Sequence, residues 1–342
     1  MRANEMSLIK PPKLNKGDKI ATISPCWGIA GEKDIVWKYR IGQRRLEDMG
    51  LEVLAAPNSM KGEEYLQSNP NARAEDIIWA FENKGIKAII ANIGGNDSER
   101  VLPYLKVDVI KNNPKIFIGY SDVMNLHLFC YKAGLSTLYG HNLLPVLAET
   151  PSFHPYSNHW FEKVLFDSSH IGEIKPAETF SCDDNNYTNK NCMKAYRKET
   201  GYLFVQGDKK AQGRLFGGHT GLKDFIGITA EDFSDKILFI EDISEFFTPK
   251  HLADFVDWLG NIGVLQKLKG LLIGKLCEYK TFDKHKTALL KIVKDKYCLH
   301  DLPIVANMNF GHSSPICILP YGALAEIDCE RKSFSIIESG VL

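Results

Sequence analysis

The first 150 residues alternate between short apolar runs and helical patterns, and this alternation limits the fold more than any other feature. Apolar runs occupy residues 19–25, 51–57, 86–95 and 115–121. Between and after them lie segments with the helical spacing of apolar residues, and each of these ends at a glycine (32–50, 71–85 and 122–134). Strands separated by helices of this length run parallel. The pattern therefore predicts an α/β fold with a parallel sheet and helices on both of its faces.

The alternation weakens after about residue 150. Residues 181–212 are polar and rich in turn formers but carry several aromatics, and we interpret them as a long loop of functional importance. Strand and helix patterns return from residue 213 onward. A chain of 342 residues is long enough for two domains. We predict one domain over residues 1–165, an interdomain linker with a substrate loop over 166–212, and a second domain over 213–342.

Composition excludes several classes of function. Lys plus Arg equals Asp plus Glu at 42 each, so the net charge gives no reason to expect a nucleic acid or an anionic membrane as partner. The N-terminus lacks the apolar core of a signal peptide, and no apolar run is long enough to span a membrane. The eight cysteines form no CxxC pair, so we interpret all of them as reduced thiols rather than as disulfides or metal ligands. These features predict a cytoplasmic protein.

Polar and glycine residues follow the apolar runs directly. In open α/β sheets, ligands bind beyond the carboxyl ends of the strands, so these residues are candidates for a site. They include a serine, carboxylates, histidines and glycine turns, which are the groups that acyl transfer requires. The candidates are Gly94-Gly95, Ser121-Asp122, Gly217-Gly218-His219, Glu241-Asp242 and Gly311-His312.

Position alone leaves alternatives open for each candidate. Ser121 stands where a strand turns into a helix, which suits a nucleophile but suits a helix N-cap at least as well. The N–H group of Asp122 and the Gly94-Gly95 turn are candidate donors to an oxyanion, although two glycines also make an ordinary tight turn. His312 and His219 compete as the base. Glu241 and Asp242 compete as the acid that orients it.

Seven segments together resemble the LD-carboxypeptidase and microcin C self-immunity family of serine peptidases. They are "LNKGDKIATISP", "ANIGGNDSERVLPYL", "KIFIGYSD", "GRLFGGH", "LFIEDISE", "KGLLIGK" and "VANMNFGHSSP". The resemblance implies Ser121 as nucleophile, His312 as base and Glu241 as the third triad member. It implies oxyanion donors at the backbone N–H groups of Asp122 and of Gly94 or Gly95.

The same resemblance implies an architecture and a mode of action. The N-terminal domain would hold a Rossmann-like parallel sheet, the C-terminal domain would be a smaller β-rich α/β unit, and the site would lie between them. Members of this family act without a metal or cofactor and form homodimers. Two positions depart from the pattern, since His219 stands where asparagine is common and Cys26 where serine is usual. His219 is also a candidate for contact with the substrate.

The long loop bears on the substrate. Residues 181–206 resemble the longer loop of the self-immunity branch, and Tyr187, Tyr196 and Tyr202 are available to stack on a flat group. The alternative is that these rings pack the loop onto the domain. The resemblance allows two substrates, the L,D-bond of a murein tetrapeptide or a peptidyl- or aminoacyl-nucleotide. A non-catalytic module that binds a small ligand is the alternative function. A histidine base predicts that activity falls below about pH 6.

Overall fold

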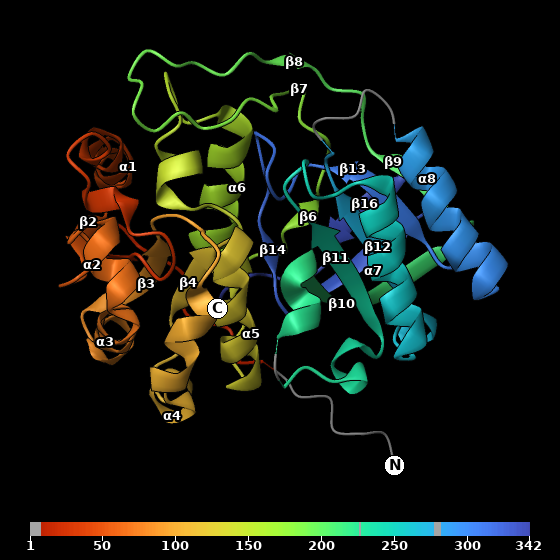
Figure 1. The fold of residues 1–342 in the computed structure, drawn as a ribbon, viewed down its shortest axis with the longest axis horizontal. Helices are drawn as coiled ribbons and strands as arrows, with labels where there is room; N and C mark the ends of the chain where they lie inside the picture. The colour runs from red at the N-terminus through yellow and green to blue at the C-terminus, as the bar shows by residue number, and fades with distance from the viewer. Residues whose placement is uncertain (1–7, 226, 277–281) are drawn as a thin grey trace.

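Two large β-sheets lie side by side in the molecule, one in each of its halves (Figure 1). The computed structural model describes residues 8–225, 227–276 and 282–342. The first half of the chain builds most of one sheet, and the second half builds most of the other. Strand β14 is an exception, because it comes from the second half and joins the first sheet. The predicted domain boundaries stay predictions.

The first sheet has six strands in the order β14-β5-β4-β3-β1-β2. Strands β1 to β5 pair in parallel and β14 is antiparallel to β5. The predicted parallel sheet is therefore confirmed. The strands are β1 (Lys19–Ile23), β2 (Glu52–Ala55), β3 (Ile86–Ala91), β4 (Ile116–Gly119), β5 (Leu138–Tyr139) and β14 (Leu319–Pro320).

Helices cover both faces of this sheet, as the alternation predicts. Successive residues of a strand point to opposite faces. In β3, Ala88 and Ile90 accordingly belong to a different apolar core from Ile89 and Ala91. The first core includes side chains of α1, and the second includes side chains of α3 and α5. The helices of this half are α1 (Val36–Asp48), α2 (Glu63–Ser68), α3 (Pro70–Glu82), α4 (Val107–Lys111), α5 (Met124–Lys132) and α6 (Pro155–Leu165).

The second sheet has eight strands in the order β6-β16-β15-β10-β11-β12-β13-β9. Its centre, β10 to β13, is parallel, and its flanks are antiparallel. Helices α7 (Pro249–Asn261) and α8 (Asp283–Leu290) lie beside it (Figure 1). This half is the β-rich α/β unit that the resemblance implies. Its strands are β6 (Gly172–Glu173), β9 (Leu203–Gln206), β10 (Lys210–His219), β11 (Lys236–Glu241), β12 (Gly270–Gly274), β13 (Ile304–Met308), β15 (Leu324–Asp328) and β16 (Ser333–Ile336).

The segment between the sheets is more ordered than the sequence predicts. Helix α6 begins at Pro155, where a helix needs no N–H group, and His154 caps it by accepting the N–H of Tyr156. Strand β9 lies inside the predicted loop and pairs with β13. The prediction of a loop over residues 181–212 is wrong for β9. The rest of the segment, with the short hairpin of β7 (Thr179–Phe180) and β8 (Arg197–Lys198), runs along one edge of the molecule across both halves (Figure 1).

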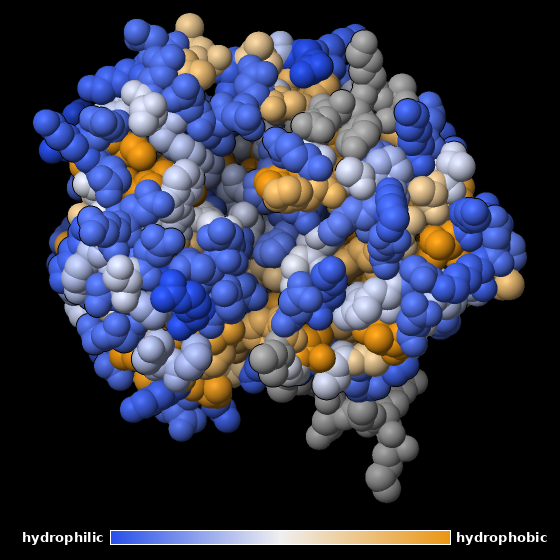
Figure 2. Space-filling view, viewed as in Figure 1, coloured by the Kyte–Doolittle hydropathy of each residue, from blue (hydrophilic) through white to orange (hydrophobic). Residues whose placement is uncertain are grey.

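The face shown in Figure 2 is largely hydrophilic, with small separate apolar groups. In the described part of the chain, none of the helices combines the length and the apolar character that crossing a membrane requires.

Candidate active site

Ser121 occupies the sharp turn between β4 and α5. It is the first residue of a short 3-10 turn, Ser121–Val123, and its φ of 66° lies in a region that residues other than glycine rarely adopt. The residue in the capping position is Tyr120, and no side chain caps the turn. The N-cap alternative for Ser121 is therefore not what the structure contains. The backbone N–H of Ser121 donates to the hydroxyl of Tyr139, 3.2 Å away.

Three residues distant in sequence form a chain of hydrogen bonds at this turn. Ser121 Oγ lies 2.9 Å from His312 Nε2, and His312 Nδ1 lies 2.6 Å from Glu241 Oε2. Glu241 is the last residue of β11 and is buried, while His312 follows β13 and is partly exposed. With Nδ1 protonated toward Glu241, Nε2 is free to accept the proton of Ser121.

The rival carboxylate and the rival histidine are engaged elsewhere. The carboxylate of Asp242 accepts a hydrogen bond from the hydroxyl of Thr220. His219 Nδ1 accepts the N–H of Gly221 at 3.0 Å and so caps the turn after β10. His219 is not among the residues that line the cleft above Ser121. Its predicted contact with substrate stays untested.

The contact between Glu241 and His312 shifts both pKa values. Burial alone would raise the pKa of Glu241, but the neighbouring His312 and the hydroxyl of Tyr139 hold it below its usual value. Burial alone would lower the pKa of His312, but the Glu241 carboxylate raises it above its usual value, with smaller contributions from Asp242 and Glu245. The pair therefore favours a charged carboxylate and strengthens the histidine as a base.

The Gly94-Gly95 turn lies directly against Ser121. A Cβ atom on Gly94 would lie 2.9 Å from Ser121 Oγ, and one on Gly95 would lie 2.8 Å from the backbone nitrogen of Trp27. Both positions thus require glycine for close approach and not for an unusual φ. Asp122 is the second residue of its 3-10 turn, where a helix offers the N–H no internal acceptor.

The carboxylate of Asp122 has a structural task. Its Oδ2 accepts the backbone N–H groups of Asp97 and Ser98, which follow the glycine turn. Arg73 of α3 approaches the same region from behind. Its guanidinium is fully buried, forms two hydrogen bonds with Asp97 and also donates to the carbonyls of Pro25 and Cys26. These contacts hold the loops after β1 and β3 together beside Ser121.

A cleft of about 420 Å³ opens above Ser121. This volume falls in the range of sites for small molecules. The two loops and the 181–206 segment contribute to its lining, and Trp27 meets Tyr187 edge to face with ring centroids 6.5 Å apart. Of the three predicted tyrosines, Tyr187 alone appears in this lining.

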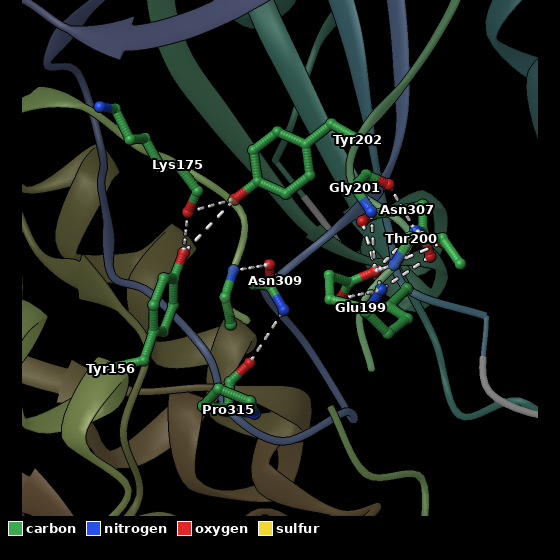
Figure 3. A network of polar contacts seen from close by, with 11 residues as sticks. Tyr156, Lys175, Glu199, Thr200, Gly201, Tyr202, Asn307, Asn309 and Pro315 are labelled. Atoms are coloured by element: carbon green, nitrogen blue, oxygen red, sulfur yellow. Dashed lines mark hydrogen bonds and ion pairs between the residues drawn. The ribbon is translucent and has the colours of Figure 1, made fainter. Parts of the chain in front are cut away.

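The other two tyrosines pack the loop onto the protein. The hydroxyl of Tyr196 contacts Glu149 and lies 2.7 Å from Ser314 Oγ. The hydroxyl of Tyr202 donates to the carbonyl of Lys175, beside the hydroxyl of Tyr156, as Figure 3 shows. The packing alternative therefore describes the contacts of Tyr196 and Tyr202.

Figure 3 also shows how the adjoining residues of the loop are attached. Asn307 donates to Glu199 and to the carbonyl of Gly201. Glu199 forms a buried ion pair with Lys275, with 2.6 Å between the charged atoms. Removal of either partner would leave the other charge buried and unpaired, which is strongly destabilising. The pair therefore holds the loop against the second sheet.

The interpretation of all cysteines as reduced thiols is wrong for one residue. Cys182 is disulfide-bonded and lines the cleft. Six other cysteines are free, and Cys277 lies outside the described residues. The spacing of the cysteines in the sequence could not reveal this disulfide, because pairing depends on distances in the fold. Within the described residues, no cluster of His, Cys, Asp or Glu is suited to hold a metal ion.

Sequence reasoning missed several residues of the site, among them Trp27, Tyr139 and Arg73. Trp27, 41% exposed, follows the first apolar run, and its place after a strand end is a signal that could have found it. Tyr139 and Arg73 touch the site through contacts that span 102 and 24 residues, respectively. No local pattern marks either of them.

Comparison with known proteins agrees with this geometry. A family model described as the LD-carboxypeptidase N-terminal domain matches residues 20–140, and one for the C-terminal domain matches residues 212–327. A putative carboxypeptidase of Bacillus subtilis is 29% identical, with 92% of this chain and 95% of the relative covered. The microcin C7 self-immunity protein MccF of Escherichia coli is 27% identical, with 87% of each covered.

A solved structure is also similar over most of its length. The MccF-like protein of Streptococcus pneumoniae, determined in complex with AMP, superimposes with a TM-score of 0.85. It is 29% identical, and the match covers 94% of this chain and 99% of that one. The α/β fold with two sheets is therefore that of these relatives.

Proposed function

The chain belongs to the LD-carboxypeptidase family, and from this premise we propose that it is a serine peptidase that hydrolyses an amide in a small peptide-like substrate. One observation carries the proposal: the unbroken chain of hydrogen bonds from Ser121 through His312 to Glu241. A serine hydroxyl is a weak nucleophile until a base removes its proton, and the base needs a partner that orients it.

Each residue has a role in the proposed reaction. His312 Nε2 takes the proton of Ser121 Oγ as that oxygen attacks the amide carbonyl. The backbone N–H groups of Asp122 and of the Gly94-Gly95 turn donate to the developing oxyanion. His312 then passes its proton to the departing amine, and an acyl-enzyme remains. Glu241 holds the tautomer of His312 and stabilises its positive charge. Water, deprotonated by His312, releases the acid and restores Ser121.

Two substrate classes fit the proposal. Relatives are called carboxypeptidases, a name that fits the L,D-bond of a murein tetrapeptide, or MccF, which fits a peptidyl- or aminoacyl-nucleotide. The cleft offers the aromatic side chains Trp27 and Tyr187 to a flat group. Stacking of a base on an aromatic ring contributes about 1–3 kcal/mol. The resemblance also predicts a homodimer, which sedimentation of the purified protein tests.

Hydrolysis by single variants tests the proposal. The parent protein and its Ser121→Ala, His312→Ala and His300→Ala variants are incubated with a murein tetrapeptide and with an aminoacyl-sulfamoyl adenosine. We expect turnover of one substrate by the parent, and near-complete loss in Ser121→Ala and His312→Ala. His300 is exposed and serves as the control. Wild-type rates in both site variants, or binding without hydrolysis by the parent, would contradict the assignment and favour a ligand-binding module.

A further inference from the structure

We infer that Arg197 binds the terminal carboxylate of the substrate, an inference that rests on the proposed peptidase function. Arg197 lies on β8 and lines the same cleft as Ser121. Among the described residues in that lining, it is the one lysine or arginine. A peptidase that removes a terminal residue has to recognise the charged end of its substrate close to the scissile amide. Arg197 is the group in this cleft with the charge to do so.

The guanidinium of Arg197 contacts an aromatic ring but has no carboxylate partner among the described residues. Its Cζ atom lies over the ring of Phe180, 5.3 Å from the ring centroid, and the two residues are register partners in the β7–β8 hairpin. In the described part of the chain, no carboxylate forms an ion pair with Arg197, although Asp183 and Asp184 line the same cleft. A guanidinium that lies over an aromatic ring keeps N–H groups available to an acceptor.

The charges around Arg197 favour one orientation of the substrate. Three exposed carboxylates also line the cleft. Asp183 and Asp184 precede Arg197 in the chain, and Glu245 follows it. A carboxylate on the substrate is repelled by these groups and attracted by the guanidinium of Arg197. Guanidinium and carboxylate can form two parallel hydrogen bonds, which fixes direction as well as position. Attraction at one point combined with repulsion elsewhere is how a site gains specificity.

Binding to a protein that cannot turn over tests this inference separately from catalysis. The Ser121→Ala protein is titrated by calorimetry with L-Ala-γ-D-Glu-L-Lys-D-Ala, both as the free acid and as its C-terminal amide. We expect the acid to bind more tightly than the amide. The additional change Arg197→Gln should weaken binding of the acid about 10- to 100-fold, the typical effect of losing a hydrogen bond between charged groups. Binding of the amide should change less than about threefold.

Lys198→Gln is the matched control, because Lys198 is the next residue of β8, carries the same charge and does not line the cleft. It should leave the binding of both peptides unchanged. Equal weakening of acid and amide by Arg197→Gln overturns the inference, as does an equal effect of Lys198→Gln. Failure of the acid to bind better than the amide when Arg197 is intact also overturns it. Binding that depends on Arg197, together with no hydrolysis of the peptide by the parent protein with Ser121 intact, would support the role of Arg197 and refute the peptidase.

Discussion

Replacement of Tyr139 by phenylalanine removes one hydroxyl that bridges two parts of the proposed triad. This hydroxyl donates to Glu241 Oε1 and accepts the backbone N–H of Ser121. Tyr139 is fully buried, so water does not replace the lost partner at either atom. We expect the change to displace or destabilise the charged form of Glu241 and to loosen the unusual backbone of Ser121.

The expected magnitude follows from the charge on Glu241. A hydrogen bond to a charged group contributes about 1.5–3 kcal/mol, which corresponds to a decrease of kcat by about 10- to 100-fold. KM should stay near its wild-type value, because Tyr139 is not in the lining of the cleft. The pKa of Glu241 should rise, since the hydroxyl lowers it in the parent protein.

The matched control is Tyr321→Phe. Tyr321 is also fully buried, its ring centroid lies 6.4 Å from that of Tyr139, and its hydroxyl donates to the carbonyl of Gly217 rather than to the triad. Steady-state kinetics and urea unfolding are measured for both variants. Tyr321→Phe should lose about 1 kcal/mol of stability, as for a neutral hydrogen bond, and Tyr139→Phe about 1.5–3 kcal/mol, because its partner Glu241 is charged. Wild-type kcat in Tyr139→Phe, or an equal loss of kcat in Tyr321→Phe, would refute the positioning role.

Other predictions concern acid sensitivity and the support of the glycine turn. The neutral form of His312 is the base, and its pKa is raised above 6.5. We therefore expect kcat/KM to decline already as pH falls through values above 6.5, which is a higher pH than the sequence alone predicts. A pH profile that stays flat down to pH 6 contradicts this. Glu245→Gln removes a carboxylate that raises this pKa, so the acid limb should move to lower pH, and 1 M salt should reduce the difference. Arg73→Met leaves Asp97 without its buried partner and should lower the free energy of unfolding by about 3–5 kcal/mol in urea denaturation. Arg100→Met removes an exposed partner of the same Asp97 and should lower the free energy of unfolding by less than about 1 kcal/mol. Equal losses in the two variants would refute the role of Arg73 in holding the two loops together.

The local pattern of apolar residues was sufficient to predict the parallel sheet, but it was insufficient to predict the elements that surround the site. Strands β1, β3 and β4 are buried almost throughout, so their apolar runs stand out in the sequence. Helix α6 does not stand out in the sequence because Pro151 and Pro155 are typical of a break, although Pro155 begins the helix. Strand β9 was hidden because its burial depends on pairing with β13, about 100 residues later. Arg73 looks like an ordinary helical arginine, and only the fold reveals the carbonyls that it binds.

Ser121 illustrates why the local and the distant information had to be combined. Its position after β4 is shared by capping serines, and nothing within a few residues distinguishes the two cases. The distinction comes from His312, 191 residues away, because its ring nitrogen and not a backbone N–H of the helix is the partner of Ser121 Oγ. It also comes from Gly94, because a side chain there would collide with Ser121 Oγ. A capping serine needs neither neighbour, so the two contacts together argue that this turn is shaped around the hydroxyl and not around the helix that follows it.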